Sequence, residues 1–180
     1  MFGVPSDETP ADERLQSLNA LNEADATAAL MRCCGSTRWA KRMVAARPFR
    51  SATELHGLAR WFWWQMDDAD WKEAFTHHPK IGADPDVLRE KFASTSDWSG
   101  TEQSGMSGAC EDTIQQLAEG NQAYDGRFGY IFIVCASGLS AAEMLERLTL
   151  RMKHTPDNEI RIAAGEQAKI TALRLDKLEF

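Results

Sequence analysis

The sequence predicts an all-α protein, a single-domain bundle of about eight helices with one short extended or irregular apolar segment near residues 130–136. Three observations support this fold class. Apolar residues recur at helical spacing along almost every segment. Several segments begin with residues that cap helix N-termini. The length of 180 residues, of which 43% are hydrophobic, suits one core.

The first half of the chain is expected to hold five helices. Their starts are marked by cap residues, at Thr9-Pro10, Asn22, Ser36 and the capping box Ser51-Ala-Thr-Glu54. Gly35 and Pro48 are expected stops, and the fifth helix covers roughly 69–78, because a proline disfavours α geometry in the residue before it. The aromatic run 61–64 covers more than one helix face, so it belongs to the core, which we favour, or to part of a subunit contact.

The second half is expected to add a short helix from Asp84-Pro85 to Phe92 and a long one from Ser99 to about Tyr124. An apolar run follows at 130–136. Periodicity alone cannot tell a lone run of this length from a buried helix, and no second strand is available to pair with it, so we expect irregular backbone. The last two helices start at Ser140-Ala-Ala-Glu143 and at Thr155-Pro156.

Composition and motifs exclude several function classes. The net charge of −7 disfavours nucleic acid, and no apolar stretch reaches the ~20 residues of a membrane span. The four cysteines have no CxxC spacing and are expected to be free buried thiols. There is no GxGxxG, P-loop, HExxH or GxSxG motif. We expect one domain over 1–180, with residues 1–10 as a candidate flexible N-terminus.

Two constellations could carry chemistry. His78 at a helix end is the first candidate for proton transfer, because an imidazole titrates near neutrality, although a structural histidine would look the same. Ser99, Glu102 and Gln103 stand together at a helix start. Ser-x-x-Glu is also a capping box, so the segment is either a cap or the floor of a polar pocket.

The chain resembles the OHCU decarboxylases, which act on 2-oxo-4-hydroxy-4-carboxy-5-ureidoimidazoline in urate degradation. The resemblance runs from about Leu18 to Leu178 and rests on several motifs in the same order. They are Arg32-Cys-Cys-Gly-Ser36 with Trp39 and Arg47-Pro-Phe49, Asp70-Trp-Lys-Glu-Ala-Phe75, His77-His-Pro-Lys-Ile-Gly82, Glu102-Gln103, Asn121-Gln-Ala-Tyr124 with Arg127-Phe-Gly129, Phe132-Ile-Val-Cys-Ala136, Glu159-Ile-Arg-Ile-Ala163 with Glu166-Gln167, and Arg174-Leu175.

The resemblance implies an all-α enzyme that uses neither metal nor organic cofactor and forms a homodimer. Its catalytic residues would be His78 and Glu102. Its substrate-binding residues would be Pro79, Ser99, Gln103, Phe132, Ile133, Val134, Cys135, Ala136 and Arg161. The adjacent carboxylate would raise the pKa of His78 and burial would lower it, and the sequence does not decide between them.

Two departures from the family pattern leave the exact substrate open. Lys80 stands where arginine is common, and Leu139 stands where many relatives carry a basic residue. The alternatives are a decarboxylase of a related ureido or imidazoline acid, and a noncatalytic helical binding module. The C-terminal Leu-Glu-Phe is not a peroxisomal signal, so we expect a cytoplasmic protein whose partner is a small-molecule substrate.

Overall fold

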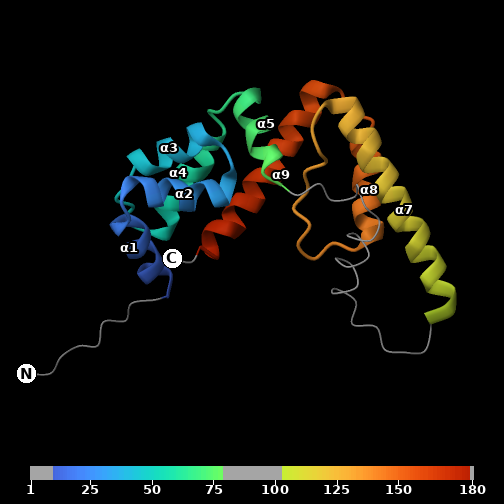
Figure 1. The fold of residues 1–180 in the computed structure, drawn as a ribbon, viewed down its shortest axis with the longest axis horizontal. Coiled ribbons are helices and arrows are strands. Elements are labelled where there is room, and N and C mark those ends of the chain that lie inside the picture. The colour runs from blue at the N-terminus through green and yellow to red at the C-terminus, as the bar shows by residue number, and fades with distance from the viewer. Residues whose placement is uncertain (1–9, 79–102, 179–180) are drawn as a thin grey trace, which may run out of the picture. The chain divides into compact units, whose positions relative to one another are not determined.

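The computed structural model describes residues 10–78 and 103–178, and within these ranges the regular structure consists of eight helices and no strand (Figure 1). The helices are α1 (Pro10–Ala20), α2 (Glu23–Cys34), α3 (Thr37–Ala45), α4 (Ala52–Trp63), α5 (Asp68–Thr76), α7 (Gln103–Phe128), α8 (Ala141–Arg151) and α9 (Pro156–Asp176). The all-α prediction is confirmed. The helix expected at Asp84–Phe92 and the start expected at Ser99 lie outside the described residues. No helix in the described ranges is long and apolar enough to cross a membrane.

The helix caps follow local sequence chemistry at most of the expected places. The side chains of Asn22 and Ser36 accept from backbone amides in the first turns of α2 and α3. Ser140 and Glu143 form the full reciprocal capping box of α8. The box expected at α4 forms only in half, because the Glu54 carboxylate accepts from the amide of Arg50, at 2.6 Å, instead of from that of the capping serine.

Contacts within the chain divide it into two compact units, residues 1–77 with 167–180 (unit 1) and residues 78–166 (unit 2). In unit 1, α3 packs beside α2 and α4 and also contacts α5 (Figure 1). Two buried indole groups of unit 1 are hydrogen-bonded: Trp39 Nε1 donates to the carbonyl of Ala59 at 2.9 Å and Trp71 Nε1 to that of Trp63 at 3.2 Å. The single-domain assignment over 1–180 stays a prediction.

The aromatic run of α4 divides between core and surface. Trp63 is 2% exposed and packs against Trp71, as expected for a core residue. Trp61 and Trp64 are 59% and 43% exposed, so the assignment of the whole run to the core is wrong for these two side chains. The other interpretation, a contribution to a subunit contact, stays a prediction.

The C-terminal end of α5 packs closely against the backbone of Gly35. Gly35 ends α2 with φ of +82°, a left-handed conformation that suits glycine. A Cβ built on Gly35 would lie 2.8 Å from the Cβ of His77, which is the C-cap of α5. The close packing of Gly35 against His77 therefore leaves no room for a larger residue at position 35, directly before the predicted catalytic histidine in the chain.

Unit 2 contains α7 and α8 side by side (Figure 1), with an apolar run between them in the chain. The run Tyr130–Ala136 adopts neither helix nor strand, which confirms the expected irregular backbone. Tyr130, Phe132, Ile133 and Val134 are nevertheless buried. Buried backbone outside a helix or a sheet must find other hydrogen-bond partners, and the charged side chains described next supply two of them.

Candidate functional site

The residues predicted to perform catalysis fall at the edge of the described structure. His78 is partly buried and stands two residues beyond the end of α5. Pro79, Ser99 and Glu102 lie outside the described residues. Gln103 is the first residue of α7, and its side chain also lies outside the description. The predicted pairing of His78 with Glu102 therefore stays a prediction.

The other predicted site residues are described. Phe132, Ile133 and Val134 are buried, while Cys135 and Ala136 are partly exposed. Arg161 is exposed, on the second turn of α9. The apolar run therefore contains both buried anchoring residues and a segment open to solvent in this chain.

A buried polar group, which we call the Glu159 cluster, lies beside this run in unit 2. It consists of Tyr124, Arg151, His154 and Glu159. The Glu159 side chain is fully buried, and Arg151 Nε donates to its Oε1 at 2.6 Å. The Tyr124 hydroxyl donates to the same oxygen, and His154 Nδ1 lies 2.7 Å from Oε2. The Glu159 carboxylate thus contacts polar side chains from α7, from α8 and from the turn before α9.

Local sequence explains how these groups meet. Arg151 is the last residue of α8, and Glu159 lies in the first turn of α9. A cation at a helix C-terminus and an acid at a helix N-terminus are each favoured by the helix dipole. The short connection between the two helices brings both ends together, and the Tyr124 side chain from α7 completes the group. Burial raises the pKa of Tyr124 well above its ordinary value, so its hydroxyl stays protonated as a donor.

Two charged side chains hold the apolar run: Arg151 of the Glu159 cluster and Glu166. Arg151 Nη1 donates to the carbonyl oxygen of Ile133 at 2.5 Å, and its guanidinium carbon lies 4.6 Å from the centroid of the Phe132 ring. The Glu166 carboxylate accepts from the backbone amide of Cys135 at 2.7 Å. Charged side chains of α8 and α9 therefore set the backbone geometry of the segment that the resemblance assigns to substrate binding.

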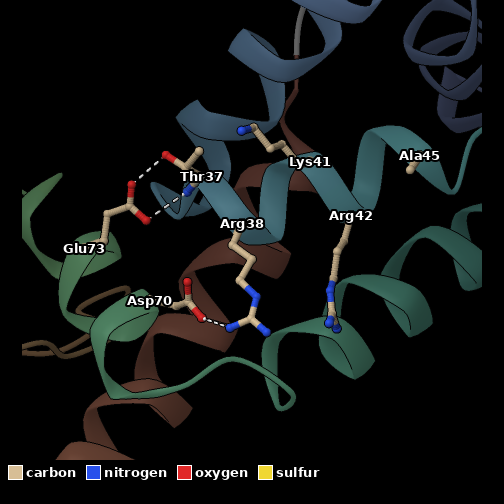
Figure 2. A pocket seen from close by; sticks show the side chains of 7 residues that line it. All are labelled: Thr37, Arg38, Lys41, Arg42, Ala45, Asp70 and Glu73. Atoms are coloured by element: carbon tan, nitrogen blue, oxygen red, sulfur yellow. Dashed lines mark hydrogen bonds and ion pairs between the residues drawn. The ribbon is translucent and has the colours of Figure 1, made fainter.

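An open pocket of about 480 Å³ lies in unit 1, and none of its lining residues is a predicted site residue (Figure 2). It is lined by Thr37, Arg38, Lys41, Arg42, Ala45, Asp70 and Glu73. Glu73 accepts from the hydroxyl and the amide of Thr37, and Asp70 pairs with Arg38 at 2.9 Å. These contacts join α3 to α5, so we assign the pocket a structural role.

Sequence reasoning missed the roles of Arg151, Glu159 and Glu166. Glu159 and Glu166 were noticed only as parts of a motif, and His154 was not among the expected site residues. One sequence signal was available. An arginine, Arg151, lies at the end of one predicted helix, and a glutamate, Glu159, lies in the first turn of the next helix after a short connection. The Asp67-x-x-Asp70 capping box of α5 was also missed, because it departs from the usual pattern of serine or threonine followed three residues later by glutamate or glutamine.

Fold and site together define a class: an all-α protein in which an irregular buried segment is held by buried charged groups. Among the described residues, no group of three or more His, Cys, Asp and Glu side chains could hold a metal ion. The family model for OHCU decarboxylase matches residues 19–176. The chain belongs to the OHCU decarboxylase family.

Individual relatives agree with this assignment. The chain is 43% identical over 149 residues to the uric acid degradation bifunctional protein TTL of Arabidopsis thaliana, covering 81% of this chain and 45% of that protein. It is 34% identical over 76 residues to the 2-oxo-4-hydroxy-4-carboxy-5-ureidoimidazoline decarboxylase of Mus musculus, covering 42% of this chain and 43% of that protein. The aligned part is thus less than half the length of each curated relative.

Two solved structures are similar to this chain. One is an OHCU decarboxylase in the presence of (S)-allantoin, with 40% identity and a TM-score of 0.66, covering 82% of this chain and 94% of that one. The other is an (S)-allantoin synthase, with a TM-score of 0.66, covering 92% of this chain and 53% of that one. Its identity of 18% supports the fold alone.

Proposed function

We propose that this chain decarboxylates OHCU to (S)-allantoin in urate degradation. The observation that carries the proposal is the family match over residues 19–176. A solved OHCU decarboxylase that is 40% identical to this chain was determined in the presence of (S)-allantoin, which supports the same product here. The small-molecule substrate is therefore a ureido-imidazoline carboxylate.

The substrate supplies its own electron sink. When the bond to the carboxylate breaks, CO2 leaves and the bonding pair forms a double bond to the carbon that carries the ureido group. The pair of the ring C=N bond moves onto the ring nitrogen, which takes up a proton. The enol-like intermediate then loses its hydroxyl proton as a proton is added to the carbon that carries the ureido group. The enzyme has to hold the carboxylate, exclude water and deliver that proton to one face.

We assign the proton transfer to His78, acting on the hydroxyl of the carboxylated carbon, with Glu102 orienting the imidazole. Arg161 would bind a carbonyl or carboxylate of the substrate, and Ser99 with Gln103 would hold the ureido group. Backbone groups of residues 132–136 would line the pocket. Two features of the described part support this assignment: Arg161 is exposed, and the segment 132–136 is held firmly but is not fully buried.

The test compares two neighbouring histidines. His78→Asn should abolish turnover of freshly generated OHCU while leaving the far-UV circular dichroism spectrum unchanged. His77→Asn is the matched control, because His77 is exposed and only caps α5 through its backbone, and it should keep wild-type turnover. Allantoin is followed by circular dichroism, since uncatalysed decay gives racemic product. Substantial activity in His78→Asn would refute the assignment.

The same assay addresses the alternatives. A related ureido or imidazoline acid as the true substrate would show as turnover of that acid but not of OHCU, and a binding module would show no turnover of either. Activity without a bound metal or organic cofactor is part of the proposal, and dialysis against a chelator should leave the rate unchanged.

We also propose that the chain is a cytoplasmic homodimer. The exposed Trp61 and Trp64 of α4 are candidate members of the subunit contact, since large aromatic side chains are enriched in interfaces. Light scattering after size exclusion should give twice the chain mass, and a Trp61→Ser and Trp64→Ser double variant should shift it toward the monomer. A monomeric wild-type protein would contradict this part of the proposal.

A further inference from the structure

The backbone of the apolar run is anchored by charged side chains at points one and two residues apart. Phe132 lies against the guanidinium of Arg151, the carbonyl of Ile133 accepts from that guanidinium, and the amide of Cys135 donates to Glu166. The run is thus held through one side-chain ring, one carbonyl acceptor and one amide donor. Together they restrain the direction of the peptide groups between Phe132 and Cys135.

We propose that Arg151 and Glu166 are positioning residues for substrate binding, which they control by fixing the peptide groups of residues 132–136. The inference rests on the proposed function, in which those peptide groups face the substrate. Neither residue needs to touch the ligand. Each acts through the backbone that it orients.

The chemistry of Arg151 fits this role. Its planar guanidinium donates from Nε to Glu159 and from Nη1 to Ile133, and these two donors point in fixed directions from one rigid group. Glu159 is itself held by the Tyr124 hydroxyl, so the guanidinium cannot rotate freely. A lysine ammonium at the same place is a point charge and cannot hold both acceptors in this geometry.

Glu166 offers a sharper test, because only its acceptor oxygen is required. Glu166→Gln keeps an acceptor for the Cys135 amide, whereas Glu166→Ala removes it. Losing a hydrogen bond to a charged acceptor is expected to raise KM for OHCU about tenfold in the alanine variant. Glu166→Gln keeps a weaker, neutral acceptor, so its KM should lie between those of wild type and the alanine variant. Glu146→Ala is the matched control, since Glu146 is exposed on α8.

Arg151→Lys provides a second variant that keeps the charge, with Arg147→Lys, exposed on the same helix, as its control. All variants are measured for kcat, KM, the dissociation constant of (S)-allantoin and hydrogen exchange of the Cys135 amide. We expect KM and the dissociation constant to rise together in Glu166→Ala and Arg151→Lys, with faster exchange at Cys135. A purely structural role would lower the melting temperature without changing KM or the dissociation constant of the folded protein.

The outcomes separate this inference from the proposed function. If wild type turns over OHCU and the two variants match their controls in KM and allantoin affinity, the positioning role is refuted and the proposed function stands. If wild type neither turns over OHCU nor binds (S)-allantoin, both fail. A KM in Glu166→Gln as high as that in Glu166→Ala would also overturn the role of Glu166 as a hydrogen-bond acceptor.

Discussion

Removing the charge of Glu159 should destabilise the protein more than any exposed substitution does. The side chain is fully buried, and both of its oxygens are used: Arg151 and the Tyr124 hydroxyl share Oε1, and His154 contacts Oε2. In Glu159→Gln one oxygen becomes an NH2 group, which cannot accept. The guanidinium of Arg151, 8% exposed, would then be a buried cation without a counter-charge.

The expected cost is about 3–5 kcal/mol, the usual consequence of removing one partner of a buried ion pair. That is a large part of the ~5–15 kcal/mol that stabilises a typical domain, so the variant should fold but unfold at a clearly lower urea concentration. Urea denaturation followed by far-UV circular dichroism measures the difference. Glu146→Gln, a change of the same chemistry at an exposed position of α8, should stay within about 0.5 kcal/mol of wild type.

A double variant distinguishes the charge effect from a general disturbance of packing. Combining Glu159→Gln with Arg151→Met removes both charges and leaves an apolar side chain of similar length, so part of the lost stability should return. A loss below about 1 kcal/mol in the single variant would place the pair among ordinary surface ion pairs and refute the reasoning. The reasoning would also be refuted if the double variant lost as much free energy of unfolding as the two single variants lose together.

Two further predictions concern unit 1. Gly35→Ala should cost roughly 1–2 kcal/mol for the left-handed backbone alone, and more because the new methyl group would meet His77, so its melting temperature should fall well below that of a Gly57→Ala control in open space. Burial raises the pKa of Cys33 to about 11 and of Cys34 to about 12, from 9.0. Because the unfolded thiols ionise first, the stability that they contribute is complete below pH 9 and is lost as the pH rises toward those values. Urea unfolding across this range should show a smaller decline for Cys34→Ala, and an equal decline would contradict the prediction.

Helix starts were predictable because a cap depends on only a few neighbouring residues. Asn22, Ser36 and Ser140 each accept from the amide three residues ahead, and these contacts need no information from the rest of the fold. Where the prediction was partly wrong, the cause was equally local. Arg50 precedes the cap of α4, and both its backbone amide and its guanidinium donate to the Glu54 carboxylate.

The predicted site came from a different source. His78, Glu102 and Arg161 were assigned by resemblance, since their spacing alone fits a structural histidine, a helix cap and a surface arginine equally well. The family match now supports the same reaction for this chain. Glu102 lies outside the described residues, so the mutual geometry of these three side chains stays a prediction.

The Glu159 cluster shows why a correct local interpretation can still miss a site. An arginine in the last turn of α8 and a glutamate in the first turn of α9 each satisfy the rules for exposed helix ends, and sequence provides no reason to bury them. Tertiary packing buries them: the Arg151 guanidinium lies against the ring of Phe132 from the apolar run and against the ring of Tyr124 from α7. That run has no strand partner in the described chain, so its peptide groups need donors and acceptors from side chains. The irregular backbone of the apolar run and the buried charges of the Glu159 cluster therefore depend on each other. A substitution in the cluster should change the backbone of the run, and a substitution in the run should change the stability of the buried charges.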